Sequence, residues 1–189
     1  VPSFTDFTAV GETLGLQNFF DLLNSVGQKV RLKAGRLVDY EEVKRANTIL
    51  LGGNQLWSGR IFAYAEGFSF YRSTIINKNP RSGERAVYKP EFDPLTNNLM
   101  HDYALILMLP NERSGERILL AYGIFTQGSQ AAIEYITSPD RLTELRKVVI
   151  EQSPDHKTVP RYFQVLIETT VENSVPGKSS LVSTRIIPQ

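Results

Sequence analysis

The first third of the chain alternates short apolar runs with helical patterns, and this alternation restricts the fold more than any other feature of the sequence. Three runs, Phe4–Val10, Lys29–Ala34 and Thr48–Leu51, are expected to be strands. Apolar residues at helical spacing from Leu16 to Val26 predict a helix, and a capping pattern beginning at Asp39 predicts a shorter one. A strand–helix–strand–helix–strand order is typical of parallel strands joined by right-handed crossovers.

The second half of the chain indicates antiparallel strands instead. Tyr103–Leu109 and Arg117–Tyr122 are its most apolar runs, and the linker between them is too short for a crossover helix, so they should form a hairpin. Loops are expected over Lys89–Asn98 and Gly123–Gly128. Helices are expected over Ser129–Ile136 and from Pro139 to Ile150, the second with Ser138 as its N-cap. Strands are expected over Tyr162–Val171 and Leu181–Ile187, with a turn between them at Pro176–Gly177. The sequence therefore predicts one α/β domain over residues 1–189, a three-layer sandwich with a Rossmann-like or flavodoxin-like parallel first half and antiparallel strands added in the second half.

Composition excludes several classes of function. Hydrophobic residues make up 41% of the chain, enough for a core, and the net charge of +1 with no basic stripe argues against direct contact with nucleic acid. The absence of cysteine excludes thiolate metal sites, and with only two histidines, His101 and His156, we expect neither a metal site nor a cofactor. No apolar run approaches the ~20 residues that span a bilayer, so this segment should not insert into a membrane.

The chain begins with Val1 rather than methionine, so we expect it to be a fragment of a longer protein. Its contacts would then include other domains of the same chain. The sequence does not fix the compartment, and it leaves open a membrane tether through the missing parts.

Three loops combine the features expected of a ligand site. Each follows an apolar strand and precedes a helix, and in an open parallel sheet such loops meet at the carboxyl ends of the strands, where ligands bind. Glycine allows close approach of the backbone, and helix N-termini favour anions. The predicted ligand-binding residues are Gly11, Glu12 and Thr13 in the first loop, Gly52, Gly53 and Asn54 in the second, and Thr126, Gln127, Gly128 and Ser129 in the third. None of the loops matches G-x-G-x-x-G or a phosphate loop, and such turns also need glycines and caps when they bind nothing.

Individual side chains have both functional and structural interpretations. Glu12, at the mouth of the predicted cleft, would be a general acid/base or would bind a ribose, but a glutamate in the first turn also simply complements the helix dipole. His101 and Asp102 are adjacent on a strand, so they should point to opposite faces and not pair. His156 should be solvated. The aromatic stretch from Trp57 to Tyr71 could line a pocket or a partner surface, although core packing is its commoner role.

Several short segments together resemble a known family. They are Phe7–Leu16, Asn47–Asn54 with Trp57 after it, Asp102–Ile106, Tyr122–Ala132, Phe163–Val171 and Pro176–Gly177. They resemble a poorly characterised α/β domain at the C-terminus of bacterial, acidobacteria-like signalling proteins that carry winged-helix or cyclase-like regulatory regions. The chain departs from that pattern with Ser129 in place of a threonine and with the double glycine Gly52–Gly53. The resemblance implies a sensory or regulatory role and assigns no catalytic residue.

Three functions follow as predictions. The favoured one is a non-enzymatic, ligand-sensing or regulatory domain of a bacterial signalling protein, which binds a small anionic or nucleotide-like ligand at the glycine-rich loops. The second is an enzyme that acts on a nucleotide-like substrate with Glu12 as acid/base. The third is a protein-interaction or dimerisation module, including a homodimer.

Overall fold

The computed structural model describes residues 10–52, 62, 65–111 and 115–188. Its helices are α1 (Val10–Ser25), the 3₁₀ turn η2 (Gly35–Leu37), α2 (Tyr40–Val43), α4 (Thr126–Thr137) and α5 (Pro139–Glu151). Its strands are β1 (Thr48–Leu51), β2 (Phe68–Phe70), β3 (Ile75–Asn77), β4 (Val87–Tyr88), β5 (Glu91–Phe92), β6 (Leu99–Pro110), β7 (Arg117–Gly123), β8 (Phe163–Glu172) and β9 (Val175–Ile186).

The main sheet is mixed, and its strands lie in the order β1-β7-β6-β8-β9, with β5 paired to the start of β6. β1 and β7 are parallel, whereas every other strand pair in the described residues is antiparallel. The predicted β6–β7 hairpin is confirmed, with Leu107 opposite Leu120. The chain is therefore α/β with a mixed sheet. A parallel first half is not found in the described part, where β1 has β7, from the second half, as its parallel neighbour.

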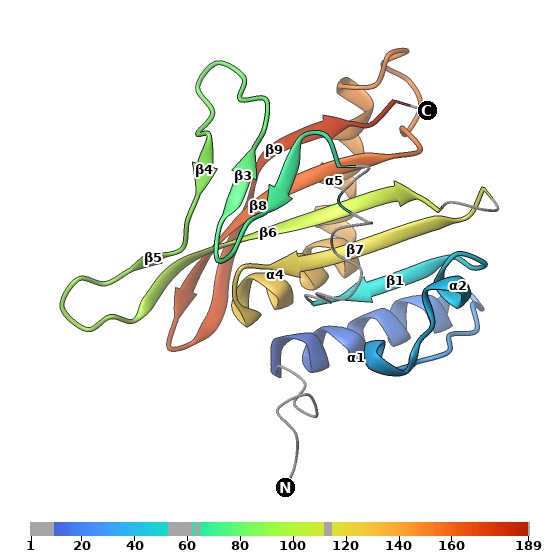
Figure 1. Ribbon diagram of the computed structural model, residues 1–189, viewed down its shortest axis with the longest axis horizontal. Helices are drawn as coiled ribbons and strands as arrows, with labels where there is room; N and C mark the ends of the chain where they lie inside the picture. The colour runs from blue at the N-terminus through green and yellow to red at the C-terminus, as the bar shows by residue number, and fades with distance from the viewer. Residues whose placement is uncertain (1–9, 53–61, 63–64, 112–114, 189) are drawn as a thin grey trace, which may run out of the picture.

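Two layers cover the two faces of this sheet (Figure 1). Helices α1, α4 and α5 pack on one face, where β6 contributes Ala104 and Ile106 to the core. The small antiparallel sheet β2-β3-β4 and helix α2 pack on the other face, against Tyr103, Leu105 and Leu107 of the same strand. The alternation of side chains along β6 explains why one continuous apolar strand supplies both cores.

A buried polar network fastens the small sheet to the main sheet. The Arg185 side chain on β9 forms an ion pair with Glu84, which follows β3, and both side chains are at most 15% exposed. Arg185 also lies 4.8 Å above the ring of Phe68 on β2. The side-chain oxygen of Gln164 on β8 accepts hydrogen bonds from the backbone N–H groups of Gly67 and Phe68, at 3.0 and 2.9 Å. Polar pairing, as well as apolar packing, thus fixes the position of β2.

Several sequence-based element boundaries were wrong. The segment Lys29–Ala34 is not a strand: Val30 and Leu32 are exposed, and no strand of the described residues pairs with them. Val10, expected to end a strand, begins α1, and the rest of that expected strand lies outside the described residues. The expected loop Gly123–Gly128 contains the start of α4, and the loop Lys89–Asn98 contains β5.

The turn between the last two strands was also misplaced. Pro176 and Gly177 lie inside β9, and the chain reverses at Asn173 and Ser174, whose φ values are 51° and 64°. Two successive positive φ angles are what a two-residue β-hairpin turn requires. Pro176 is tolerated in β9 because that strand is at the edge of the main sheet.

Candidate functional site

The carboxyl ends of β1 and β7 meet the first turns of α1 and α4, and four of the predicted binding residues come together there. The backbone N–H of Gly11 donates to Thr126 Oγ1 at 3.1 Å, and the Thr126 hydroxyl donates to Glu12 Oε2 at 3.2 Å. Gly52, directly after β1, faces the same carboxylate, since a Cβ built on it would lie 3.1 Å from Glu12 Oε1. We call Gly11, Glu12, Gly52 and Thr126 the loop cluster.

Steric constraints explain why glycine occupies positions 11 and 52 of the loop cluster. Gly52 has a φ of +73°, the left-handed region that glycine adopts without strain. At Gly11, a side chain would run into the backbone carbonyl of Thr126, so α1 approaches α4 more closely than any other residue would allow.

Gly11→Ala is therefore expected to lower the free energy of unfolding by about 1–3 kcal/mol, the usual cost of overpacking against backbone. Urea denaturation of the variant and the parent chain measures this difference. Gln17→Ala, at an exposed position on the same helix, is the control and should leave stability nearly unchanged. Equal effects of the two substitutions would contradict the close packing of α1 on α4.

The N-terminus of α4 already has an anionic partner within the chain. Asp102 on β6 is fully buried, and its Oδ2 accepts hydrogen bonds from the N–H groups of Phe125 and Gly128 at 3.0 and 2.7 Å. Its Oδ1 accepts from the N–H of Tyr103 at 2.8 Å. Burial raises the pKa of Asp102 to about 6, and the three backbone donors oppose that rise. The partial positive charge at the N-terminus of α4 is therefore next to the Asp102 carboxylate and favours its negative charge.

The remaining residues of the third loop have contacts within the fold. A Cβ at Gly128 would lie 2.6 Å from Asp102 Oδ2, so this glycine admits the carboxylate. Ser129 is buried and its Oγ accepts from the N–H of Gly123 at 3.0 Å. The Gln127 amide reaches the carbonyl of Ser174, at the β8–β9 turn.

Thr13 is exposed on α1, one residue beyond the loop cluster. Gly53 and Asn54, the other predicted residues of the second loop, lie outside the described residues.

Aromatic side chains border the loop cluster, and the sequence reasoning missed the most important of them, Tyr122. The ring centroids of Tyr122 and Phe70 are 4.3 Å apart, and Phe62 contacts Phe70 edge-on at 5.6 Å. Burial raises the pKa of the Tyr122 hydroxyl, and the negative charge of Glu12 adds to the rise. A tyrosine at the last position before a strand-ending glycine was the available signal for this residue.

The aromatic stretch expected between Trp57 and Tyr71 divides between several roles. Phe68 is fully buried in the core beneath Arg185, whereas Tyr71 is 61% exposed. Trp57 lies outside the described residues. Phe62 and Phe70 are half-buried beside Tyr122, so they belong to both the core and the edge of the loop cluster.

The two histidines lie away from the loop cluster. His101 and Asp102 point to opposite faces of β6 as predicted, and His101 Nδ1 lies 3.2 Å from Glu168 Oε1 on β8. His156 is exposed, with Nδ1 2.7 Å from the carbonyl of Glu151. No group of three or more potential metal ligands occurs among the described residues. In the same part of the chain, no helix has the length and apolarity needed to cross a bilayer.

In chemical terms, the loop cluster offers the Glu12 carboxylate and the Thr126 hydroxyl group, and the flat rings of Tyr122 and Phe70 lie at its border. A carboxylate accepts hydrogen bonds from hydroxyl or amino groups, and the rings suit a planar group. With Glu12 and Asp102 both at this end of the sheet, donors are favoured over further anions. Comparison with known proteins adds no assignment: the chain matches no family model, no curated protein and no solved structure.

Proposed function

We propose that this chain is a ligand-sensing or regulatory domain of a larger bacterial signalling protein, and that it binds a small nucleotide-like ligand at the loop cluster. One observation carries the proposal. Gly11 and Glu12, Gly52, and Thr126 come from three segments that are far apart in the sequence, yet they converge at the carboxyl ends of two parallel strands. This is the place where open α/β sheets bind ligands.

The chemistry of the loop cluster narrows the ligand. Glu12 is suited to accept hydrogen bonds from the hydroxyl groups of a ribose, while the Tyr122 and Phe70 rings are suited to contact a base. Because the Asp102 carboxylate accepts the N–H groups of Phe125 and Gly128, the start of α4 is disfavoured as a phosphate site. The proposed ligand therefore binds through its nucleoside part.

A thermal-shift screen tests this proposal with nucleosides, nucleotides, dinucleotides, sugar phosphates and small carboxylates. A ligand at about one hundred times its Kd adds roughly 2.7 kcal/mol to stability, which raises the Tm clearly. Glu12→Gln should weaken binding of a nucleoside-containing hit about tenfold, since it removes a charge-assisted hydrogen bond. Asp21→Asn, the same charge change at an exposed position of α1, is the control and should leave the affinity unchanged.

The screen also separates a sensor from an enzyme. A sensor binds the hit without converting it, whereas an enzyme that uses Glu12 as acid/base would turn the hit over and lose that turnover in Glu12→Gln while still binding. Incubation of each hit with the protein, followed by chromatography, decides between them. A panel without any nucleoside-containing hit would contradict the proposal.

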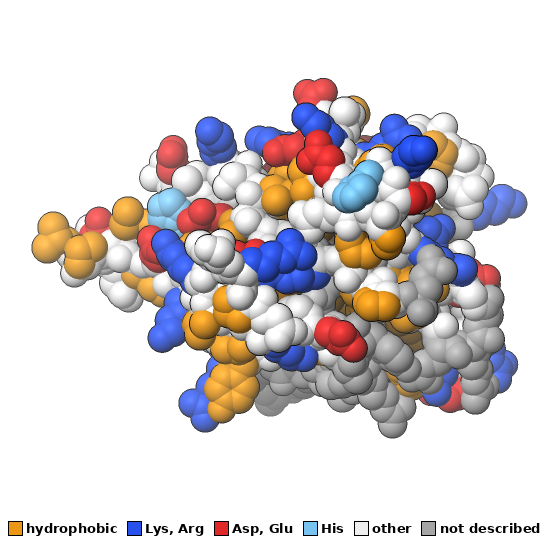
Figure 2. Space-filling view, turned by 90° about the horizontal axis from the view of Figure 1, so that it is seen from above, with side chains coloured by type: hydrophobic (Ala, Val, Ile, Leu, Met, Phe, Trp, Pro, Cys, Tyr) orange, Lys and Arg blue, Asp and Glu red, His pale blue; other side chains and the backbone are white. Residues whose placement is uncertain are grey.

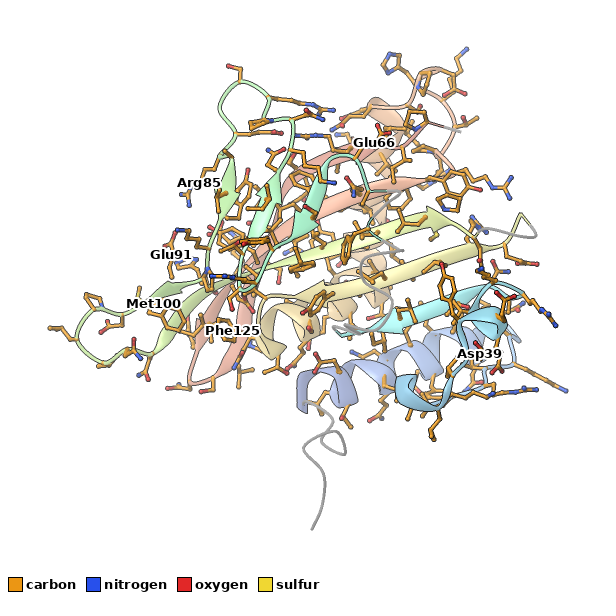
Figure 3. All side chains as sticks on the ribbon, viewed as in Figure 1. Asp39, Glu66, Arg85, Glu91, Met100 and Phe125 are labelled. Carbon is orange, nitrogen blue, oxygen red and sulfur yellow. The ribbon has the colours of Figure 1, made fainter. Side chains whose placement is uncertain are left out.

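A second candidate function, an interaction or dimerisation module, is favoured by an apolar tip. Exposed hydrophobic side chains gather where β5 meets β6 and where α4 and β9 begin: Phe92, Leu95, Met100, Phe125 and Val175, of which Leu95 is 93% exposed. Phe92 and Phe125 contact edge-on at 5.9 Å. Figure 2 shows hydrophobic side chains protruding at one end of the molecule, and Figure 3 labels Met100 and Phe125 at the same end. Sedimentation of the parent chain and of Leu95→Asp would reveal association through this tip.

A further inference from the structure

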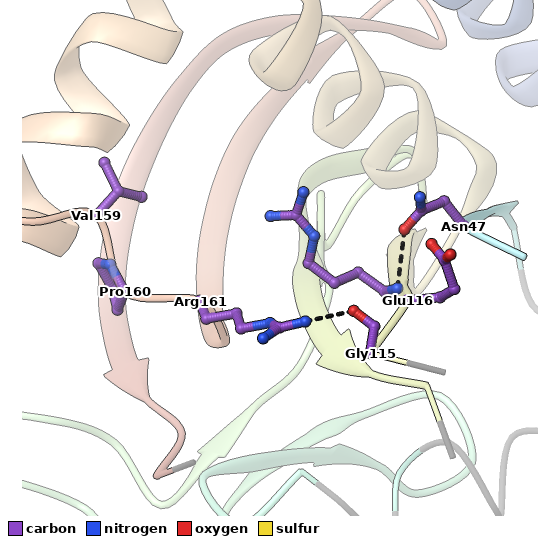
Figure 4. Close-up of a pocket in the computed structure, with 7 residues that line it drawn as sticks. Asn47, Gly115, Glu116, Val159, Pro160 and Arg161 are labelled. Atoms are coloured by element: carbon purple, nitrogen blue, oxygen red, sulfur yellow. Dashed lines mark hydrogen bonds between the residues drawn. The ribbon is translucent and has the colours of Figure 1, made fainter. Parts of the chain in front are cut away.

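A polar hollow lies at the opposite end of the β1–β7 pair from the loop cluster. It has a volume of about 470 Å³ and opens to solvent at the amino ends of β1 and β7. Its lining is formed by Asn47, Gly115, Glu116, Arg117, Val159, Pro160 and Arg161 (Figure 4). These residues come from the start of β1, the start of β7 and the connection between α5 and β8.

The register of the sheet explains why two arginines share this hollow. Arg117 is opposite Pro110 on β6. The β6–β8 pairing places Met108 opposite Phe163, and extending it by two residues brings Arg161 to the other side of Pro110. Arg117 lies on β7 with the facing of Leu119, which packs against the helix-covered core, whereas Arg161 lies two residues before β8. Both arginines line the hollow, although they come from different parts of the chain.

The charges in the hollow are not neutralised by ion pairing. Within the described residues, neither Arg117 nor Arg161 has a carboxylate within ion-pairing distance, in contrast to Arg185 and Arg141. Arg161 donates one hydrogen bond to the carbonyl of Gly115, and this contact holds its side chain across the hollow (Figure 4). An arginine carries five N–H donors, so most of those of Arg161 remain for a ligand.

Asn47 adds a neutral donor. Its side-chain oxygen accepts the backbone N–H of Arg117 at 2.9 Å, so the amide is held at the start of β7 (Figure 4). The oxygen is thereby engaged, and the NH₂ group of the same amide remains a donor. Glu116 lies at the same rim and supplies the one negative charge of the lining.

We propose that this hollow binds the oxyanion group, phosphate or carboxylate, of a small molecule. Guanidinium groups stay charged at all physiological pH values and match the geometry of oxyanions with paired N–H donors. The two guanidinium groups and the Asn47 amide supply hydrogen-bond donors to the hollow for an anionic group. Glu116 disfavours a second anionic group, so the rest of the molecule should be neutral and rich in hydroxyl groups.

An NMR titration with inorganic phosphate and, separately, with acetate tests this inference at constant ionic strength. At least one of the two anions should move the amide signals of Gly115 and Arg117 in a saturable way. Arg117→Gln and Arg161→Gln should each weaken this binding about tenfold or more, as expected for the loss of a charged hydrogen-bond partner. The two probes distinguish a phosphoryl group from a carboxylate as the preferred anion.

Arg72→Gln provides the matched control, because it removes the same charge from an exposed turn between β2 and β3. It should leave the anion affinity unchanged. Signal changes that grow linearly without saturation for both anions, or that weaken equally in Arg72→Gln, would overturn the proposal. Because the titration of the parent chain is informative by itself, a variant that fails to fold does not remove the test.

Discussion

Arg185→Met is expected to lower the free energy of unfolding by about 3–5 kcal/mol, because it leaves the Glu84 carboxylate buried without its cation. Arg185 is the donor at the centre of the network that joins the small sheet to β9, and its hydrogen bonds extend to the side chain of Asn77 and the carbonyl of Asn79. Guanidinium chloride denaturation measures the loss. Arg85→Met breaks the ion pair between Arg85 and Glu91, whose side chains are 64% and 50% exposed, respectively. Because this pair is exposed, the substitution should lower the free energy of unfolding far less than Arg185→Met does.

The ion pair between Arg185 and Glu84 predicts that the free energy of unfolding depends on pH with a definite sign. Arg185 holds the pKa of Glu84 well below its usual range, so the ion pair stabilises the fold above the ordinary glutamate pKa of about 4.3. This contribution is lost as the pH falls through that value toward the folded-state pKa. The stability difference between parent and Arg185→Met should therefore be largest near pH 7 and shrink between about pH 5 and pH 3. A difference that stays constant over this range would contradict the assignment.

Asp102→Ala should have the next largest effect, a loss of about 3 kcal/mol in the free energy of unfolding, since it leaves three backbone donors, two of them buried, without their acceptor. Asp93→Ala is an informative control. Asp93 also accepts from two backbone N–H groups, those of Leu95 and Thr96, but in an exposed loop where water replaces the lost acceptor. Its effect should be much smaller, and a comparable loss in both variants would contradict the importance of burial at Asp102.

Asp102 and Glu84 respond to pH in opposite directions. The folded-state pKa of Asp102, about 6, lies above the ordinary aspartate value of about 3.9. A carboxyl group with a raised folded pKa contributes stability that is complete below its unfolded pKa and is lost as the pH rises through the folded one. The contribution of Asp102 should therefore grow as the pH falls from about 7 to 4, and that of Glu84 should decline below about 5.

Local signals in the sequence predicted the elements whose formation depends on near neighbours. The β6–β7 hairpin follows from two apolar runs with a short linker, and the start of α5 follows from Ser138 and Pro139. The short helix after Asp39 is also present, and the Asp39 side chain accepts the N–H of Glu41. In each case the residues that decide the structure lie close together in the chain.

Features that depend on distant partners were not predictable in this way. Lys29–Ala34 alternates like a strand, but strand formation needs a neighbour, and none of the described strands pairs with this segment. The partnerships of Arg185 with Glu84 and of Asp102 with the start of α4 join residues whose proximity only the folded sheet creates. In the candidate site, the sequence predicted that the loops after the strands would meet. It did not predict that Tyr122 borders the loop cluster, or that Asp102 accepts the N–H groups at the start of α4.

The capping of α4 by a side chain from β6 has a consequence for how the chain folds. The first turn of an isolated helix is costly to form, and here its donors are satisfied only when β6 is already alongside. β6, β7 and α4 follow one another in the chain and should therefore form in one cooperative step. In native-state hydrogen exchange, the amides of Phe125 and Gly128 should exchange at the same rate as the amides at the centre of β6. In Asp102→Ala, the two exchange rates should differ.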